Sequence, residues 1–134
     1  MRLDHAIHNE DLCRKLYLKS CSFDWVITIA FYSALHYSQY EVFPFQVGNR
    51  IYHNFDDYYN VFKSNKDNKH QARQRLVYSH ISASAGAAYR WLKDNCWSAR
   101  YYSYLVDESD ARIALEKLDI IKSHLSKLET VKGT

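Results

Sequence analysis

The residues best suited to chemistry lie between Lys69 and His80, in the stretch KHQARQRLVYSH. If this stretch is one helix, Arg73 and His80 lie about 20° apart around its axis, with His70 on the same face. A guanidinium can hold a phosphate through two hydrogen bonds and stabilise negative charge as it develops. A histidine titrates near neutral pH and can move a proton to or from a hydroxyl. The pattern therefore fits metal-free chemistry on a phosphodiester.

Two other interpretations of this stretch stay open. Arg75 and His80 are five residues apart, about 140° around a straight helix, so they would act together only if the helix broke after Tyr78. The stretch is also compatible with a solvated basic helix that carries incidental histidines.

Candidate groups elsewhere are weaker. His36 lies in an apolar segment, where a lone histidine is more often a hydrogen-bonded core group than a catalyst. Arg100 is interpreted as the partner of a buried acid such as Asp24, or as a phosphate contact. His5 and His8 have the spacing of two helical metal ligands but lack a third ligand, so we expect no metal and no other cofactor.

The elements that position these side chains are expected to be helices. Three glycines and one proline in 134 residues leave few breaks in the chain. The segment from Asp24 to Phe43 is apolar on nearly every side up to Tyr37, which predicts a central helix buried all round. Pro44 ends this helix, because the residue before a proline is disfavoured in the helical conformation.

Capping residues and the three-four spacing of apolar residues predict the surrounding helices. These helices are expected at about Asp4 or Asn9 to Lys19, Asn54 to Phe62, His70 to His80, Ser82 or Ser84 to Tyr101, and Asp107 or Ser109 to Leu128. The segments Phe45 to His53 and Ser64 to Lys69 are expected to be loops. The expected core faces comprise Ile7, Leu12, Cys13 and Leu16; Ala85, Ala88, Tyr89, Leu92, Cys96 and Ala99; and Ala111, Leu115, Leu118, Ile121, Leu125 and Leu128. The prediction is an all-α, up-and-down bundle of four to five helices in one domain with a core at about residues 5–128.

Composition narrows the function classes. A net charge of +3 permits an RNA partner but falls short of the basic excess of a dedicated nucleic-acid binder. The three cysteines show no C-x-x-C spacing, which favours reduced thiols in a cytoplasmic protein. The most apolar run, Trp25 to Tyr37, is too short to span a bilayer, and the acidic N-terminal stretch does not have the pattern of a signal peptide.

Several motifs taken together resemble the HEPN-domain family. They are Asp24-Trp25 followed by Phe31-Tyr32-Ser33-Ala34-Leu35-His36, then His70-Gln71-Ala72-Arg73, then Ser98-Ala99-Arg100-Tyr101. The resemblance extends from about His5 to Leu128. It implies a helical bundle, usually dimeric, which in active members carries an R-x4–6-H motif that forms a metal-independent endoribonuclease site.

The resemblance implies roles for the candidates between Lys69 and His80 and several kinds of partner. Arg73 would hold the phosphate, His80 would be the acid or base and His70 a helper. A polar residue usually follows the motif arginine in the family, and Gln74 follows Arg73 whereas a leucine follows Arg75, so Arg73 is favoured. Active members often belong to toxin–antitoxin or phage-defence systems, with an antitoxin or a nucleotidyltransferase-type partner. Other members only bind RNA, nucleotide or a partner protein, with the arginines, including Arg75 and Arg100, as anion contacts.

The aromatic residues predict a homodimer. Those of Tyr52 to Tyr59, Trp91, Trp97 and Tyr101 to Tyr104 exceed what a monomer of this size needs to cover its core. The bland alternative is that the 12 tyrosines pack in the core and at its rim. No membrane partner is expected.

Overall fold

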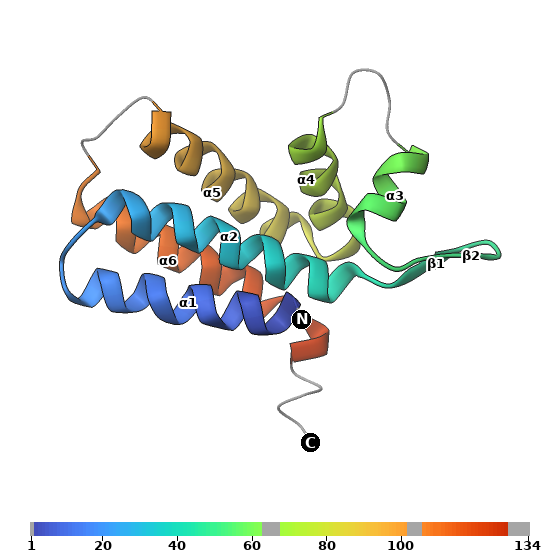
Figure 1. Cartoon of the computed structure of the whole chain (residues 1–134), viewed down its shortest axis with the longest axis horizontal. Helices are drawn as coiled ribbons and strands as arrows, with labels where there is room; N and C mark the ends of the chain where they lie inside the picture. The colour runs from blue at the N-terminus through green and yellow to red at the C-terminus, as the bar shows by residue number, and fades with distance from the viewer. Residues whose placement is uncertain (1, 63–67, 102–105, 129–134) are drawn as a thin grey trace.

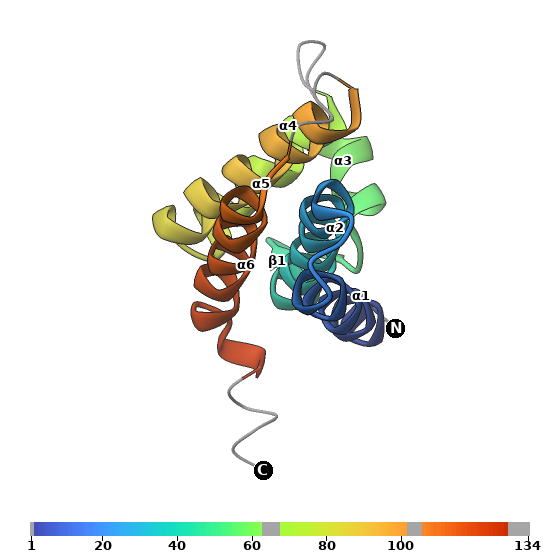
Figure 2. The same cartoon turned by 90° about the vertical axis from the view of Figure 1, so that its left-hand side faces the viewer.

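Helix α2 (Phe23–Val42) lies at the centre of the fold and contacts α1, α5 and α6. The computed structural model describes residues 2–62, 68–101 and 106–128, without the side chains of Arg2, Arg100 and Tyr101. Helices α1 (Arg2–Leu18), α5 (Ala83–Tyr101) and α6 (Glu108–Ser123) complete the bundle (Figure 1). Seen from one end, α1 and α2 form one pair of helices and α5 and α6 the other (Figure 2). The predicted all-α class is confirmed.

Helix α2 is buried on most of its circumference. Its buried side chains include Val26, Ile27, Ala30, Phe31, Ala34, Leu35, Tyr37 and Val42. One face is open, because Trp25 is 54% exposed and Tyr32, two turns later, is 40% exposed. The prediction of burial on every side is therefore wrong for this face. No helix within the described ranges is both long and apolar enough to cross a membrane.

Of the predicted core face of α1, Cys13 is buried and Leu16 packs against the core, whereas Ile7 and Leu12 do not. Ile7 and Leu12 are 41% and 39% exposed, whereas Ala6, Glu10 and Cys13 are buried. The small side chain of Ala6 lets the two helices approach closely enough for Ser33 Oγ to donate a hydrogen bond to the Ala6 carbonyl at 2.8 Å. The prediction that Ile7 and Leu12 form the core face is wrong, because close packing here selects small residues over large apolar ones.

Three of the predicted helix caps are confirmed. The side chains of Asn54, Ser82 and Asp107 accept hydrogen bonds from backbone N–H groups at 2.9, 3.0 and 3.0 Å. Each satisfies a donor in the first turn that the helix itself leaves unpaired. They start α3 (Phe55–Phe62), α5 and α6 respectively.

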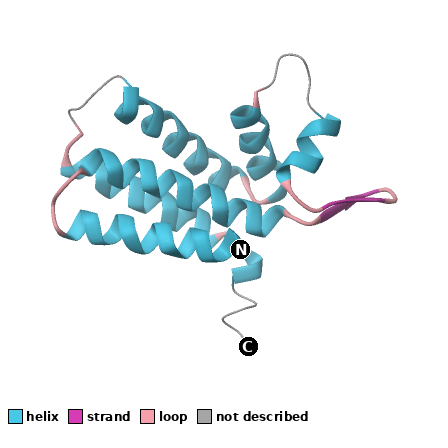
Figure 3. Ribbon diagram, in the orientation of Figure 1, coloured by secondary structure: helices cyan, strands magenta, loops and turns pink. Residues whose placement is uncertain are grey.

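The segment predicted to be a loop contains a β-hairpin. Strands β1 (Phe45–Val47) and β2 (Arg50–Tyr52) pair antiparallel, and Val47 faces Arg50 across the two-residue turn (Figure 3). Gly48 has a φ of 61°, which suits the first position of a type II′ hairpin turn, where glycine is required. The loop prediction is therefore wrong, because the turn chemistry of Gly48-Asn49 between two short extended runs was overlooked.

A second, aromatic core cluster joins the hairpin, α3 and α4 (Lys69–His80) to the end of α2. Its buried members are Val42, Phe43, Tyr52, Phe55, Ala72 and Leu76. Because Tyr52 and Phe55 are each only 3% exposed, they do not supply the exposed aromatic surface from which a dimer was predicted. Residues 102–104 of that surface lie outside the described residues.

A buried carboxylate ties three helices together. Glu10 on α1 accepts hydrogen bonds from Tyr37 Oη on α2 at 2.6 Å and from Lys122 Nζ on α6 at 2.9 Å. Arg14 Nε donates a further bond at 2.9 Å. Burial acts to raise the pKa of the Glu10 carboxyl, but these bonds outweigh burial and hold the pKa below its usual value.

Residues beyond α6 close the C-terminal end of α2. Lys127 Nζ donates hydrogen bonds to the carbonyls of Tyr40 and Phe43, both at 3.0 Å. The Glu41 carboxylate accepts one bond from Ser126 Oγ at 2.7 Å and another from the backbone N–H of Lys127 at 3.0 Å. Two of the carbonyls that end α2 without intrahelical partners are thereby satisfied by a positive charge, which also suits the helix dipole.

Glu10→Gln is expected to lower the free energy of unfolding at pH 7 by about 2 kcal/mol, because charge-assisted hydrogen bonds become weaker neutral ones. The folded-state pKa lies below the unfolded value of about 4.5, so the contribution is present above that pH and is lost as pH falls through the folded pKa. Urea unfolding at pH 7 and at acidic pH should show that the difference in free energy of unfolding between variant and wild type becomes smaller at acidic pH. The exposed neighbour Asp11→Asn is the control, and a difference that does not change with pH would contradict the assignment.

Candidate functional site

Helix α4 carries all of the predicted catalytic residues on one uninterrupted helix. It starts with a capping box in which Asn68 Oδ1 accepts from the Gln71 N–H at 2.9 Å and Gln71 Oε1 accepts from the Asn68 N–H at 3.2 Å. The helix continues to His80, so it contains no break after Tyr78 that would bring Arg75 towards His80. Arg75 is exposed on its surface.

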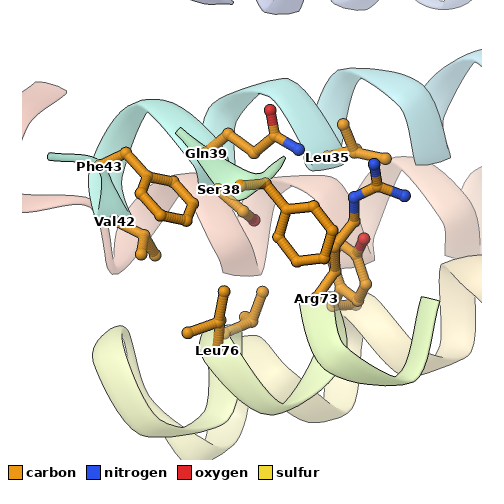
Figure 4. Close-up of a pocket in the computed structure, with 10 residues that line it drawn as sticks. Leu35, Ser38, Gln39, Val42, Phe43, Arg73 and Leu76 are labelled. Carbon is orange, nitrogen blue, oxygen red and sulfur yellow. The ribbon is translucent and has the colours of Figure 1, made fainter. Parts of the chain in front are cut away.

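Arg73 points from α4 towards α2. Its guanidinium carbon lies 4.5 Å from the centroid of the Phe55 ring, a distance typical of a cation–π contact. Figure 4 shows the guanidinium beside Leu35, at the edge of a small cavity also lined by Ser38, Gln39 and other side chains of α2, α3, α4 and α5. The guanidinium is therefore half-buried and held against aromatic surface.

His80 lies in a different environment at the other end of α4. Its ring centroid is 4.5 Å from that of Phe45 in the hairpin. Partial burial lowers the pKa of the imidazole, which favours the neutral form near pH 7. Seven residues of helix separate Arg73 from His80, about 10.5 Å along the axis. Arg73 packs near Phe55 and His80 near Phe45, so the two side chains lie in different surroundings within one chain.

His70 is the predicted residue that the structure groups with Arg73. Burial, and then the positive charges of Arg73 and Lys93, lower the pKa of its imidazole. Its ring centroid lies 6.4 Å from that of Phe31 on α2. His70 therefore lies where α4 meets both α2 and α5.

His70 also lines a surface cleft of about 570 Å³ between α2, the start of α4 and the second half of α5. Phe31 and Cys96 are its buried residues, while Tyr32 and Trp97 are 40% and 54% exposed. The polar side chains that line it are Asn68, His70, Gln71, Lys93 and Asp94. The volume lies within the range of small-ligand sites, which typically combine aromatic walls with a few polar groups.

The charged groups of the cleft are partly neutralised by one another. Lys93 Nζ donates to Gln74 Oε1 at 2.7 Å and lies 3.6 Å from Asp94 Oδ1. The Asp94 carboxylate is also 3.7 Å from Arg90 Nε. Lys93 is therefore held beside His70, and Asp94 has two cationic neighbours.

Sequence reasoning missed Tyr32, Lys93 and Trp97 as site residues. Lys93 and Trp97 are four apart on α5, and Tyr32 interrupts the apolar surface of α2 two turns after Trp25. The sequence signal for each of them is confined to its own helix, and nothing in the sequence places these helices beside one another. The side chain of Arg100, the other predicted binding residue, lies outside the described residues.

No protein-family model, curated protein or solved structure matches this chain. Among the described residues no three His, Cys, Asp or Glu side chains are grouped so that they could hold a metal ion. Functional assignment therefore depends on the residues and geometry above, together with the sequence motifs.

Gly86 allows the C-terminal half of α4 to lie close to the start of α5, at the other end of α4 from the cleft. A Cβ at position 86 would lie 2.4 Å from Cγ of the Tyr78 ring, well inside van der Waals contact. Gly86→Ala is expected to lower the free energy of unfolding by about 1 kcal/mol, because overpacking outweighs the gain in helix propensity. Urea unfolding would measure this, with Ala87→Gly on the exposed side of α5 as a control for propensity. A more stable Gly86→Ala variant would show that Tyr78 moves aside without loss.

Proposed function

We propose that this chain is a HEPN-type helical domain that binds single-stranded RNA in the cleft between α2, α4 and α5. The observation that carries this proposal is the combination of two exposed aromatic side chains, Tyr32 and Trp97, with the cationic Lys93 and the titratable His70 in one cleft. Proteins that bind single strands combine the same two components, aromatic faces for bases and positive charge for phosphates.

Aromatic exposure supports a ligand with flat apolar faces. Trp97 and Tyr32 expose about half of their surfaces beside the buried ring of Phe31. Every base has a π-face, so stacking on such residues does not depend on sequence. In a folded duplex the bases are not available for this contact, which favours a single strand.

The charge around the cleft supports an anionic ligand. Lys93 lies in it beside the Asp94 carboxylate, and the positive charge of Arg73 lies close enough to His70 to lower the pKa of the imidazole. The first turn of α4 also faces the cleft through Asn68 and Gln71, and the N-terminal end of a helix favours negative charge. The modest net charge of +3 suits a short contact of one or a few nucleotides.

A second candidate function is metal-independent RNA cleavage by Arg73 and His80, with His70 as helper. The observation that favours it is the lowered pKa of His80, which leaves a neutral imidazole able to accept a proton near pH 7. Because Arg73 and His80 are about 10.5 Å apart along α4, a homodimer that brings the two residues from different copies together would be required. A toxin or phage-defence role, with an antitoxin or nucleotidyltransferase-type partner, would follow only from this activity.

Fluorescence anisotropy with a labelled oligonucleotide of about ten nucleotides tests the binding proposal. Trp97→Ala is expected to weaken binding about 5- to 150-fold through the loss of one stacked base. Lys93→Ala should weaken binding and reduce the slope of log affinity against log salt by about 0.7, the value for one phosphate contact on a single strand. The matched controls are Trp25→Ala, which removes an equally exposed tryptophan outside the cleft, and Lys15→Ala on α1. Equal losses in variants and controls would contradict the proposal.

Incubation of RNA with the purified protein in EDTA tests the second candidate. Cleavage by wild type and its loss in His80→Ala, with the fold retained by circular dichroism, is the expected result if α4 is catalytic. His124→Ala, an exposed histidine just after α6, should leave cleavage unchanged. Binding without cleavage in wild type would exclude this candidate and leave the binding proposal intact.

A further inference from the structure

Three residues from three helices, each with a buried polar atom, line one small cavity. Ser38 Oγ on α2, Arg73 Nε on α4 and Tyr89 Oη on α5 each lack a hydrogen-bond partner within the part of the chain that the structure describes. All three residues line the cavity shown in Figure 4, which has a volume of about 10 Å³. Buried polar atoms are almost always paired, so three unpaired atoms around one space require a common explanation.

The other side chains that line the cavity offer these three atoms few hydrogen-bond partners. They are mainly apolar and comprise Leu35, Val42, Phe43, Phe55, Leu76 and Val77, with Gln39 as the other polar residue. Ser38 and Tyr89 are only 4% and 1% exposed, so bulk solvent does not reach their hydroxyl groups. Unpaired donors in such surroundings would destabilise the folded protein.

One water molecule matches this cavity in size and in chemistry. A buried water needs about 10–15 Å³ and two to four polar partners, and the cavity supplies about 10 Å³ and three partners. The water oxygen can accept from Arg73 Nε and from one hydroxyl, and a water hydrogen can be donated to the other hydroxyl. All three atoms would then be satisfied together.

We propose that a single bound water bridges Ser38, Arg73 and Tyr89, and that Ser38 and Tyr89 thereby position the Arg73 guanidinium. With Nε held by the water and the guanidinium carbon 4.5 Å from the Phe55 ring centroid, the guanidinium cannot rotate freely. Its terminal N–H groups then stay on the side of α4 where its charge acts on His70. The consequence for ligand binding rests on the proposed RNA-binding function, whereas the water itself does not.

Tyr89→Phe distinguishes a hydroxyl that is hydrogen-bonded to water from an unpaired one by the sign of the change in thermal midpoint. Removal of a hydroxyl that is paired to water should lower the thermal midpoint by about 3 °C, whereas removal of a truly unpaired one should raise it. Ser38→Ala should lower it as well, and the double variant should lose less than the sum because both share one water. Tyr37→Phe, which loses the 2.6 Å hydrogen bond from Tyr37 Oη to Glu10, calibrates the loss of a paired hydroxyl. A raised midpoint for Tyr89→Phe would overturn the proposal.

A crystal structure at high resolution, grown in bromide, provides the second test. A water peak within hydrogen-bonding distance of all three atoms is expected. An anomalous peak at this position would show that the cavity holds a bromide ion and not a water, and would overturn the proposal. A cavity without electron density would overturn it as well.

The positioning role has its own readout in the RNA assay. Tyr89→Phe should weaken binding in the wild-type background but have no further effect in Arg73→Lys, because lysine has no Nε–H for the water to hold. Equal effects in both backgrounds would show that Tyr89 acts through general stability and would overturn the positioning role. If wild type binds no RNA, the proposed function fails, while the thermal and crystallographic tests still decide the water.

Discussion

The need to bury α2 constrains the rest of this structure. Apolar side chains surround most of that helix, so three other helices must cover it, and α1, α5 and α6 do so. Where no described helix covers it, Trp25 and Tyr32 replace the smaller aliphatic residues. The buried Glu10 carboxylate then fixes how α1 and α6 meet α2, because only one arrangement brings Tyr37, Arg14 and Lys122 to the same two oxygens.

The candidate sites follow from the position of α4 relative to this core. Tyr78 packs on Gly86 and holds the C-terminal half of α4 against the start of α5. The N-terminal half lies across from the second half of α5, where His70, Lys93 and Trp97 line the cleft. Arg73 occupies the boundary between the two halves, with its side chain in the small cavity and its charge felt by His70. Helix α4 thus contributes its C-terminal half to the packed interior and its N-terminal half to the open cleft.

Local rules predicted the helices well because their signals are local. Asn54, Ser82 and Asp107 cap the helices that they were expected to cap, and the three-four stripe from Ala111 to Ile121 is buried. The predicted face of α1 was wrong at Ile7 and Leu12 because close packing, which depends on the partner helix, selects Ala6 over Ile7. The cleft could not be predicted either, since Tyr32, His70 and Trp97 come from three helices whose relative placement is set by the whole core. A helical wheel shows which residues of one helix share a face. It gives no information about which residues of neighbouring helices lie opposite that face.

Closure of the end of α2 by Lys127 and Ser126 has a consequence for synthesis of the protein. The ribosome makes α2 more than eighty residues before the residues that cap it, and α6, which covers another side, is also late. Until then the sides of α2 that α5 and α6 cover lack their partners in the nascent polypeptide. The domain can therefore fold completely only after α6 and the residues that follow it have been synthesised. Before that, the uncovered apolar side chains of α2 provide a binding surface for chaperones.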